Sequence, residues 1–125
     1  MDNLLVEATA ITPRVEFNKH KNIFRIEGKS LPEDVKNFYT PLVQWFETYS
    51  LHPNTETVLH LDFEYFNTSS SKMILILLNK VRDIHKKGFK VQINWSYPPH
   101  DPEIEEAGEE FAELLNIPFH YIAKD

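Results

Sequence analysis

A run of hydroxyl-bearing side chains in the middle of the sequence has the residue types and spacing most suited to chemistry. It reads Asn67-Thr68-Ser69-Ser70-Ser71-Lys72 and lies where a predicted strand is followed directly by a predicted helix. The backbone N–H groups of a first helical turn have no intrahelical partner, and Asn, Thr and Ser side chains accept hydrogen bonds from them. A hydroxyl here can also carry a phosphate, because the helix dipole and the free amides stabilise an anion. The run therefore predicts a helix N-cap, a phosphorylation site, or both together.

The same run formally matches the S-x-x-K motif of serine acyl enzymes through Ser69 and Lys72. The companion S-D-N and K-T-G motifs are missing, and so is a G-x-S-x-G nucleophile elbow. The absence of cysteine removes thiol catalysis, disulfides and thiolate metal sites. We therefore expect no catalytic residues in this chain.

The six histidines do not have the spacing of a metal site. They show neither an H-E-x-x-H motif nor an i, i+4 pair, and they are His20, His52, His60, His85, His100 and His120. His60 and His120 fall at strand positions that should face solvent, and His85 ends a predicted helix. Surface or capping roles are therefore favoured, and no metal or cofactor is expected.

The charge and composition narrow the classes of partner. The net charge of -6 argues against nucleic-acid binding, which depends on clustered Lys and Arg. No apolar run approaches the ~20 residues that span a bilayer, so the expected location is cytoplasmic and away from membranes. The length of 125 residues and the hydrophobic share of 42% fit a single globular domain over residues 1–125.

Two segments predict strands with one buried and one solvated face. In 59–65 and in 89–97, aromatic and aliphatic residues alternate with polar ones. Strands of a doubly wound sheet would instead be continuously apolar, because helices cover both of its faces. The alternation therefore indicates that helices cover one face only.

The remaining elements surround these two strands. Short strands are expected at 4–8, 15–17 and 23–27, the last two as a hairpin closed by Gly28, and a final strand at 119–123. Ser30 and Glu33 fit a capping box that starts a helix near residue 31, and Pro41 should kink that helix.

Two further helices are expected. One runs from about Thr68 to Lys87, with Gly88 as its C-cap, and its core stripe is Ile74, Leu77, Leu78, Val81 and Ile84. The other runs from about Pro102 to Leu115, with an apolar side made of Ile104, Ala107, Phe111 and Leu114. Its seven acidic residues form either a solvated face or a surface that steers a basic partner. The fold class is therefore α/β, with a single layer of about three main helices on one face of a mixed sheet of about six strands.

The segment Phe63-Glu64-Tyr65-Phe66-Asn67-Thr68-Ser69-Ser70-Ser71-Lys72 resembles the signature of the SiaC-like regulatory phosphoproteins. The likeness covers nearly the whole chain and includes Glu7-Ala8-Thr9, Phe38-Tyr39, Asn94-Trp95 and Ala107-Gly108-Glu109. It implies a fold similar to the STAS domains of anti-sigma-factor antagonists. It also implies that a Ser/Thr kinase phosphorylates the threonine matching Thr68 and that a PP2C-type phosphatase removes the phosphate. The unphosphorylated form is then expected to bind and activate a diguanylate cyclase, and so to act in c-di-GMP signalling. The proline-rich segment 98–102 departs from the pattern expected of relatives, so a partner contact made by this loop does not carry over.

The expected partner surface surrounds the phosphoacceptor. It consists of Phe66, Asn67, Thr68, Ser69, Ser70, Ser71 and Lys72. The core is the favoured place for both Tyr65 and Phe66. Phe66 breaks the strand alternation, however, and is the candidate for an exposed anchor. Two alternatives remain open at this point: a partner switch of the anti-sigma-factor-antagonist type, and a small ligand-binding domain or enzyme that uses the polar sheet face. The polar residues of that face are His60, Asp62, Glu64, Gln92 and Asn94.

Overall fold

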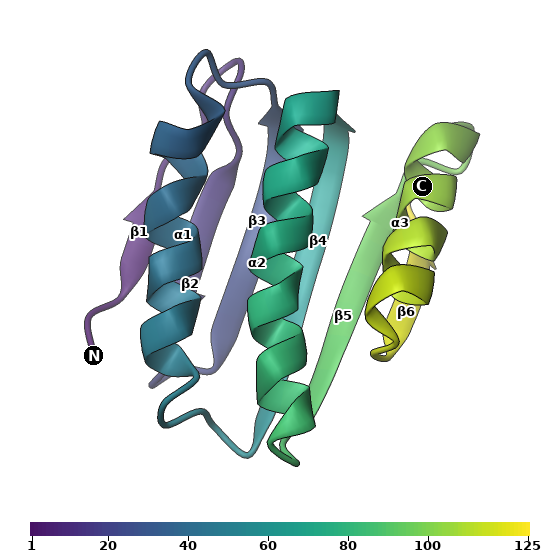
Figure 1. Cartoon of the computed structure of the whole chain (residues 1–125). Coiled ribbons are helices and arrows are strands. Elements are labelled where there is room, and N and C mark those ends of the chain that lie inside the picture. Colours follow the sequence, from purple (N-terminus) through teal and green to yellow (C-terminus); the bar gives the residue numbers. More distant parts are fainter.

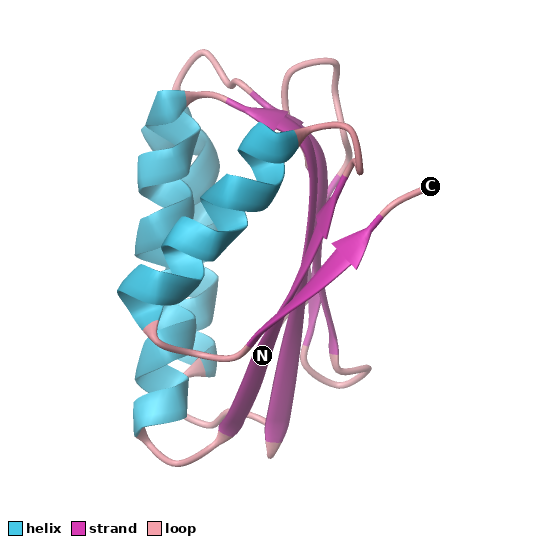
Figure 2. Cartoon of the chain, turned by 90° about the vertical axis from the view of Figure 1, so that its right-hand side faces the viewer, coloured by secondary structure: helices cyan, strands magenta, loops and turns pink.

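The computed structural model describes all 125 residues. Its helices are α1 (Val35–Tyr49), α2 (Thr68–Lys86) and α3 (Pro102–Leu115). Its strands are β1 (Leu4–Val6), β2 (Arg14–Asn18), β3 (Ile23–Ser30), β4 (Glu56–Phe66), β5 (Lys90–Tyr97) and β6 (Phe119–Ala123) (Figure 1). The three helices form one layer over one face of the sheet, and the other face is uncovered (Figure 2). The predicted α/β fold is confirmed.

The order of the strands in the sheet follows their order in the chain, β1-β2-β3-β4-β5-β6. β1, β2 and β3 pair antiparallel, whereas β3, β4, β5 and β6 pair parallel. Each parallel pair is joined through a helix, and such crossovers are almost always right-handed. Because all three crossovers advance in the same direction along the sheet, their helices lie on the same face. None of the three has the length and apolar character of a membrane-spanning helix.

The alternation predicted for the two central parallel strands is confirmed. In β4 the residues Thr57, Leu59, Leu61 and Phe63 are buried beneath the helices, and in β5 the residues Val91, Ile93 and Trp95 are. The polar residues between them face the uncovered side of the sheet.

An irregularity near the end of β4 overturns one prediction. Gly28 pairs with Phe63, but the next residue of β3, Lys29, pairs with Tyr65, so Glu64 is an extra residue in β4. An extra residue reverses the side to which the following side chains point. Tyr65 is therefore 47% exposed instead of lying in the core. Phe66 turns to the helix side and is half-buried against the core instead of being the exposed anchor.

The start of α1 also differs from the prediction. The helix begins at Val35, and its N-cap is Asp34, whose side chain accepts a hydrogen bond from the Asn37 amide at 3.1 Å. Ser30 is not a cap, because parallel pairing with β4 extends β3 as far as the Ser30–Phe66 pair. Pro41 lies inside the helix, where its ring removes one backbone donor.

The core of α2 agrees with its predicted stripe, and all five residues are buried. Gly88 follows the helix at a φ of +97°, as a C-terminal glycine often does. In α3 the prediction fails at Leu114, which is 64% exposed, while Leu115 is buried in its place.

Helix α3 approaches the sheet closely at Gly108. A Cβ atom on Gly108 would lie 2.5 Å from Nε1 of Trp95, so only glycine fits there. The Trp95 indole N–H donates to the Ile104 carbonyl at 2.9 Å. Trp95 therefore holds α3 against β5 both by contact and by a hydrogen bond.

Candidate functional site

The hydroxyl run forms the first turn of α2, as predicted. Asn67 is the N-cap, and its Oδ1 accepts a hydrogen bond from the Ser70 amide at 2.9 Å. Thr68 is the first residue of the helix and is exposed. Its backbone N–H is one of the first four of the helix, which have no intrahelical acceptor. The Thr68 hydroxyl thus stands in solvent at the positive end of a 19-residue helix.

This turn is fixed to the end of β3 by buried hydrogen bonds. The Ser30 carbonyl accepts from the Asn67 amide at 3.2 Å and from the Ser70 hydroxyl at 2.9 Å. The Ser30 hydroxyl lies 2.9 Å from Ser70 Oγ and 2.5 Å from the Tyr39 hydroxyl of α1. Burial raises the pKa of Tyr39 to about 12, against a smaller lowering by its hydrogen bonds to Ser30 and Ser70. Residues of β3 and α1 therefore hold the first turn of α2, which carries Thr68.

Exposure divides the predicted surface residues into two groups. Thr68, Ser69 and Lys72 are exposed, and Ser71 is partly so. Ser70 has 0% exposure, and its hydroxyl is used inside the protein. Ser70 therefore supports the turn from inside and presents no side-chain surface to a partner.

Phe66 lies under α3, where its ring stacks on that of Phe111. Its ring centroid is 5.3 Å from that of Phe63 and 6.1 Å from that of Trp95. Tyr65, Phe66, Asp101, Glu103, Ile104 and Ala107 line a small hollow of about 140 Å³ here. Phe66 thus connects the β4 end to the core and leaves Tyr65 as the exposed aromatic residue near the turn.

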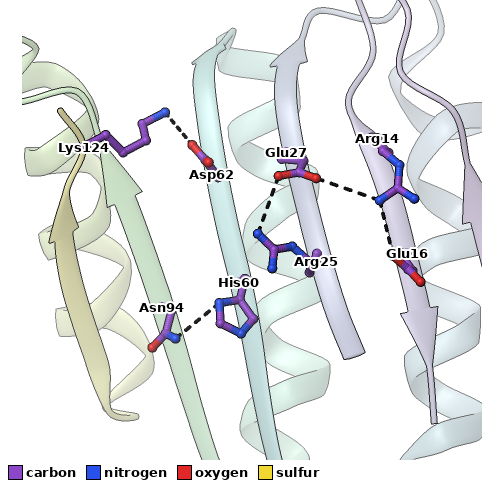
Figure 3. Close-up of polar contacts among 8 residues, drawn as sticks. All are labelled: Arg14, Glu16, Arg25, Glu27, His60, Asp62, Asn94 and Lys124. Carbon is purple, nitrogen blue, oxygen red and sulfur yellow. Dashed lines mark hydrogen bonds and ion pairs between the residues drawn. The ribbon is translucent and has the colours of Figure 1, made fainter. Parts of the chain in front are cut away.

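The uncovered sheet face carries charges that pair with one another (Figure 3). Arg14 contacts Glu16 at 3.3 Å and Glu27 at 3.9 Å, and Arg25 contacts Glu27 at 3.7 Å. Farther along the sheet, Lys124 binds Asp62 at 2.5 Å. Most charges of the face therefore satisfy one another.

The histidine of this face also has a neighbouring side chain as its partner. His60 Nδ1 lies 3.3 Å from the Asn94 amide nitrogen. Burial lowers the pKa of His60, and the Arg25 charge lowers it further, while Glu27 acts in the opposite direction. The hollow of about 290 Å³ on this face is lined by Asp62 and Glu64 but not by His60, Gln92 or Asn94. The five polar residues predicted for a ligand site thus do not surround one pocket. No group of three or more His, Asp or Glu side chains is placed to hold a metal ion.

Comparison with known proteins identifies the family. The profile of the SiaC family of regulatory phosphoproteins matches residues 6–124. The chain belongs to this family. The structure of apo-SiaC from Pseudomonas aeruginosa superposes with a TM-score of 0.90 at 27% identity, covering 98% of this chain and all of that one. SiaC of Pseudomonas aeruginosa in complex with the diguanylate cyclase SiaD, where it is the activator, superposes with a TM-score of 0.89 at 26% identity, covering 97% of this chain and 99% of that one.

A curated relative extends the comparison along the full sequence. An uncharacterized protein of Pseudomonas aeruginosa strain UCBPP-PA14 is 27% identical over 125 residues, covering all of this chain and 99% of its own length. Membership of a family of regulatory phosphoproteins confirms the regulatory role predicted from the sequence.

The buried hydroxyl network of Ser30, Tyr39 and Ser70 is the part of the candidate site that the sequence did not reveal. Ser30 was assigned to a helix cap, and Ser70 to the exposed surface. The only sequence signal for Tyr39 was its place in the Phe38-Tyr39 segment, which is part of the family resemblance. No local pattern connects these residues, because Ser70 is 40 positions from Ser30 in the chain.

Proposed function

We propose that this chain is a cytoplasmic switch protein that binds and activates a diguanylate cyclase while Thr68 is unphosphorylated. Phosphorylation of Thr68 by a Ser/Thr kinase releases the cyclase, and a PP2C-type phosphatase restores binding. The observation that supports this most is the exposed hydroxyl of Thr68 at a helix start, in a fold that superposes on cyclase-activating SiaC. The activation of SiaD is a property of that relative, and its transfer to this chain is the proposal.

The position of Thr68 suits a reversible modification. A phosphate on Thr68 is stabilised by the helix dipole and by the free amides of the first turn, so the fold tolerates it. The buried network of Ser30, Tyr39 and Ser70 lies beneath the turn and does not have to open for a kinase to reach Thr68. A partner docked over Thr68, however, would have to desolvate a dianion, which is unfavourable without a matching cation. The phosphate therefore blocks binding locally.

The test uses the diguanylate cyclases encoded in the source genome, each purified and assayed for c-di-GMP formation with and without the chain. We expect one cyclase to be activated by the wild type and by Thr68→Ala, but not by a chain carrying phosphothreonine at position 68. Thr40→Glu, an acidic substitution at an exposed threonine of α1, serves as the control and should activate normally. If no cyclase responds, or if the phosphorylated chain activates as well as the wild type, the proposal is wrong.

A further inference from the structure

The outer face of α2 continues the phosphorylation site for two more helical turns. Thr68, Lys72 and Ile76 are spaced at i, i+4 and i+8, so they lie above one another along about 12 Å of helix. Ser69 stands beside them, and all four side chains are exposed. We call Thr68, Ser69, Lys72 and Ile76 the switch stripe. It faces away from the buried residues of α2, which pack on the sheet.

Ile76 gives the switch stripe an apolar end. It is 43% exposed, and the other large apolar side chains that are comparably exposed lie outside α2. A single exposed isoleucine needs no explanation by itself. Its place is informative here because it continues a surface whose other end carries the phosphoacceptor.

Lys72 gives the stripe a free cation. It forms no ion pair within the chain, whereas Arg14, Arg25 and Lys124 on the sheet face are paired. The chain as a whole has a net charge of -6, so this unpaired lysine is a local positive charge beside the phosphoacceptor of an acidic protein. A carboxylate is therefore the group that best matches the middle of the stripe.

We infer that the switch stripe docks a segment of the cyclase that places an acidic side chain on Lys72 and an apolar side chain on Ile76. The inference rests on the proposed function and names the chemistry of its partner surface. It also gives a second way, besides the cost of desolvating the phosphate, in which phosphorylation weakens partner binding. A phosphate on Thr68 lies one turn from Lys72 and pairs with it, so the cation is withdrawn from the partner and the incoming carboxylate meets a dianion.

The test measures affinity for the purified cyclase that the wild type activates. Ile76→Ala and Lys72→Gln should each weaken binding at least about tenfold, which corresponds to ~1.4 kcal/mol. Lys72→Glu should weaken it more, because it reverses the charge. The matched controls are Leu114→Ala, an exposed leucine on α3, and Lys86→Gln, an exposed lysine at the far end of α2, and both should bind as the wild type does.

A second measurement needs no partner. With phosphothreonine incorporated at position 68, the phosphorus NMR titration should give a lower phosphate pKa in the wild type than in Lys72→Gln, and Lys86→Gln should leave it unchanged. Normal binding by Ile76→Ala and Lys72→Gln would overturn the inference while leaving the cyclase proposal intact. If no cyclase is activated, the cyclase proposal fails, and the phosphate titration alone decides whether Lys72 belongs to the switch.

Discussion

Replacing Gly108 by alanine tests the packing of α3 on the sheet. The new Cβ atom would lie 2.5 Å from Nε1, 2.6 Å from Cδ1 and 2.7 Å from Cε2 of Trp95. Ordinary carbon contacts are about 3.5–4.0 Å long, so the helix or the indole must move by about 1 Å. Three ring atoms oppose the methyl group together, and a buried indole cannot rotate away from all of them.

The expected change in the free energy of unfolding is the sum of one stabilising and two destabilising effects. Alanine in a helix interior is favoured over glycine by about 1 kcal/mol. Overpacking a tight core costs about 1–3 kcal/mol, and loss of the Trp95–Ile104 hydrogen bond costs about 1 kcal/mol more. We therefore expect Gly108→Ala to lower the free energy of unfolding by about 1–3 kcal/mol. Urea unfolding followed by far-ultraviolet circular dichroism measures this change independently of tryptophan fluorescence.

Two further variants separate the contact from the backbone. In a Trp95→Leu background the obstructing ring is gone, so Gly108→Ala should cost less than it does alone. Gly88→Ala meets no atom within 4 Å and is strained only by its positive φ of 97°, so its cost measures backbone strain without a steric contact. A Gly108→Ala protein as stable as the wild type would show that α3 does not lie this close to Trp95.

Three other predictions concern the cap and two titrating groups. Asn67→Ala should cost about 1 kcal/mol of stability because Asn67 is the N-cap, whereas Thr68→Ala should change it by less than about 0.5 kcal/mol, and equal losses in thermal unfolding would contradict this assignment. The raised pKa of Tyr39 favours the protonated phenol in the folded state, so stability should fall between about pH 10 and 12 by at most about 2–3 kcal/mol, and Tyr39→Phe should remove that part of the fall in urea unfolding. The lowered pKa of His60 favours the neutral ring, so stability should decrease as the pH falls below about 6.5, and an unchanged pH profile in His60→Gln would contradict the reasoning.

The sequence predicted those elements whose signals are local. The alternation in β4 and β5, the stripe of α2 and the acceptor groups at Asn67 and Thr68 all act within a few residues of one another. The predictions that failed concern residues whose positions depend on pairing between distant segments. Ser30 and Glu33 satisfy the pattern of a capping box, but pairing with β4 keeps Ser30 in a strand. Tyr65 was expected in the core but is exposed, because the extra residue Glu64 is defined only by the register against Gly28 and Lys29.

The same distinction holds for the candidate site. The position of Thr68 was predictable, since helix starts have a recognisable composition. The burial of Ser70 was not, because it depends on Ser30 and Tyr39, which the fold brings to it from 40 and 31 positions away. The outward position of Ile76 was predictable, because the core stripe expected for α2 leaves it out.

The order of the strands has a consequence for when the first turn of α2 can be assembled. Every hydrogen bond that fixes the turn joins residues between Ser30 and Ser71: the Ser30 carbonyl, the Tyr39 hydroxyl, the Asn67 cap and the Ser70 hydroxyl. Sequential neighbours in the chain are also neighbours in the sheet, so β4 can pair with β3 without waiting for β5 or β6 to be synthesised. The contacts that position Thr68 are thus all encoded before the final 54 residues are translated, and α3 adds its support last, through Trp95 and Phe66.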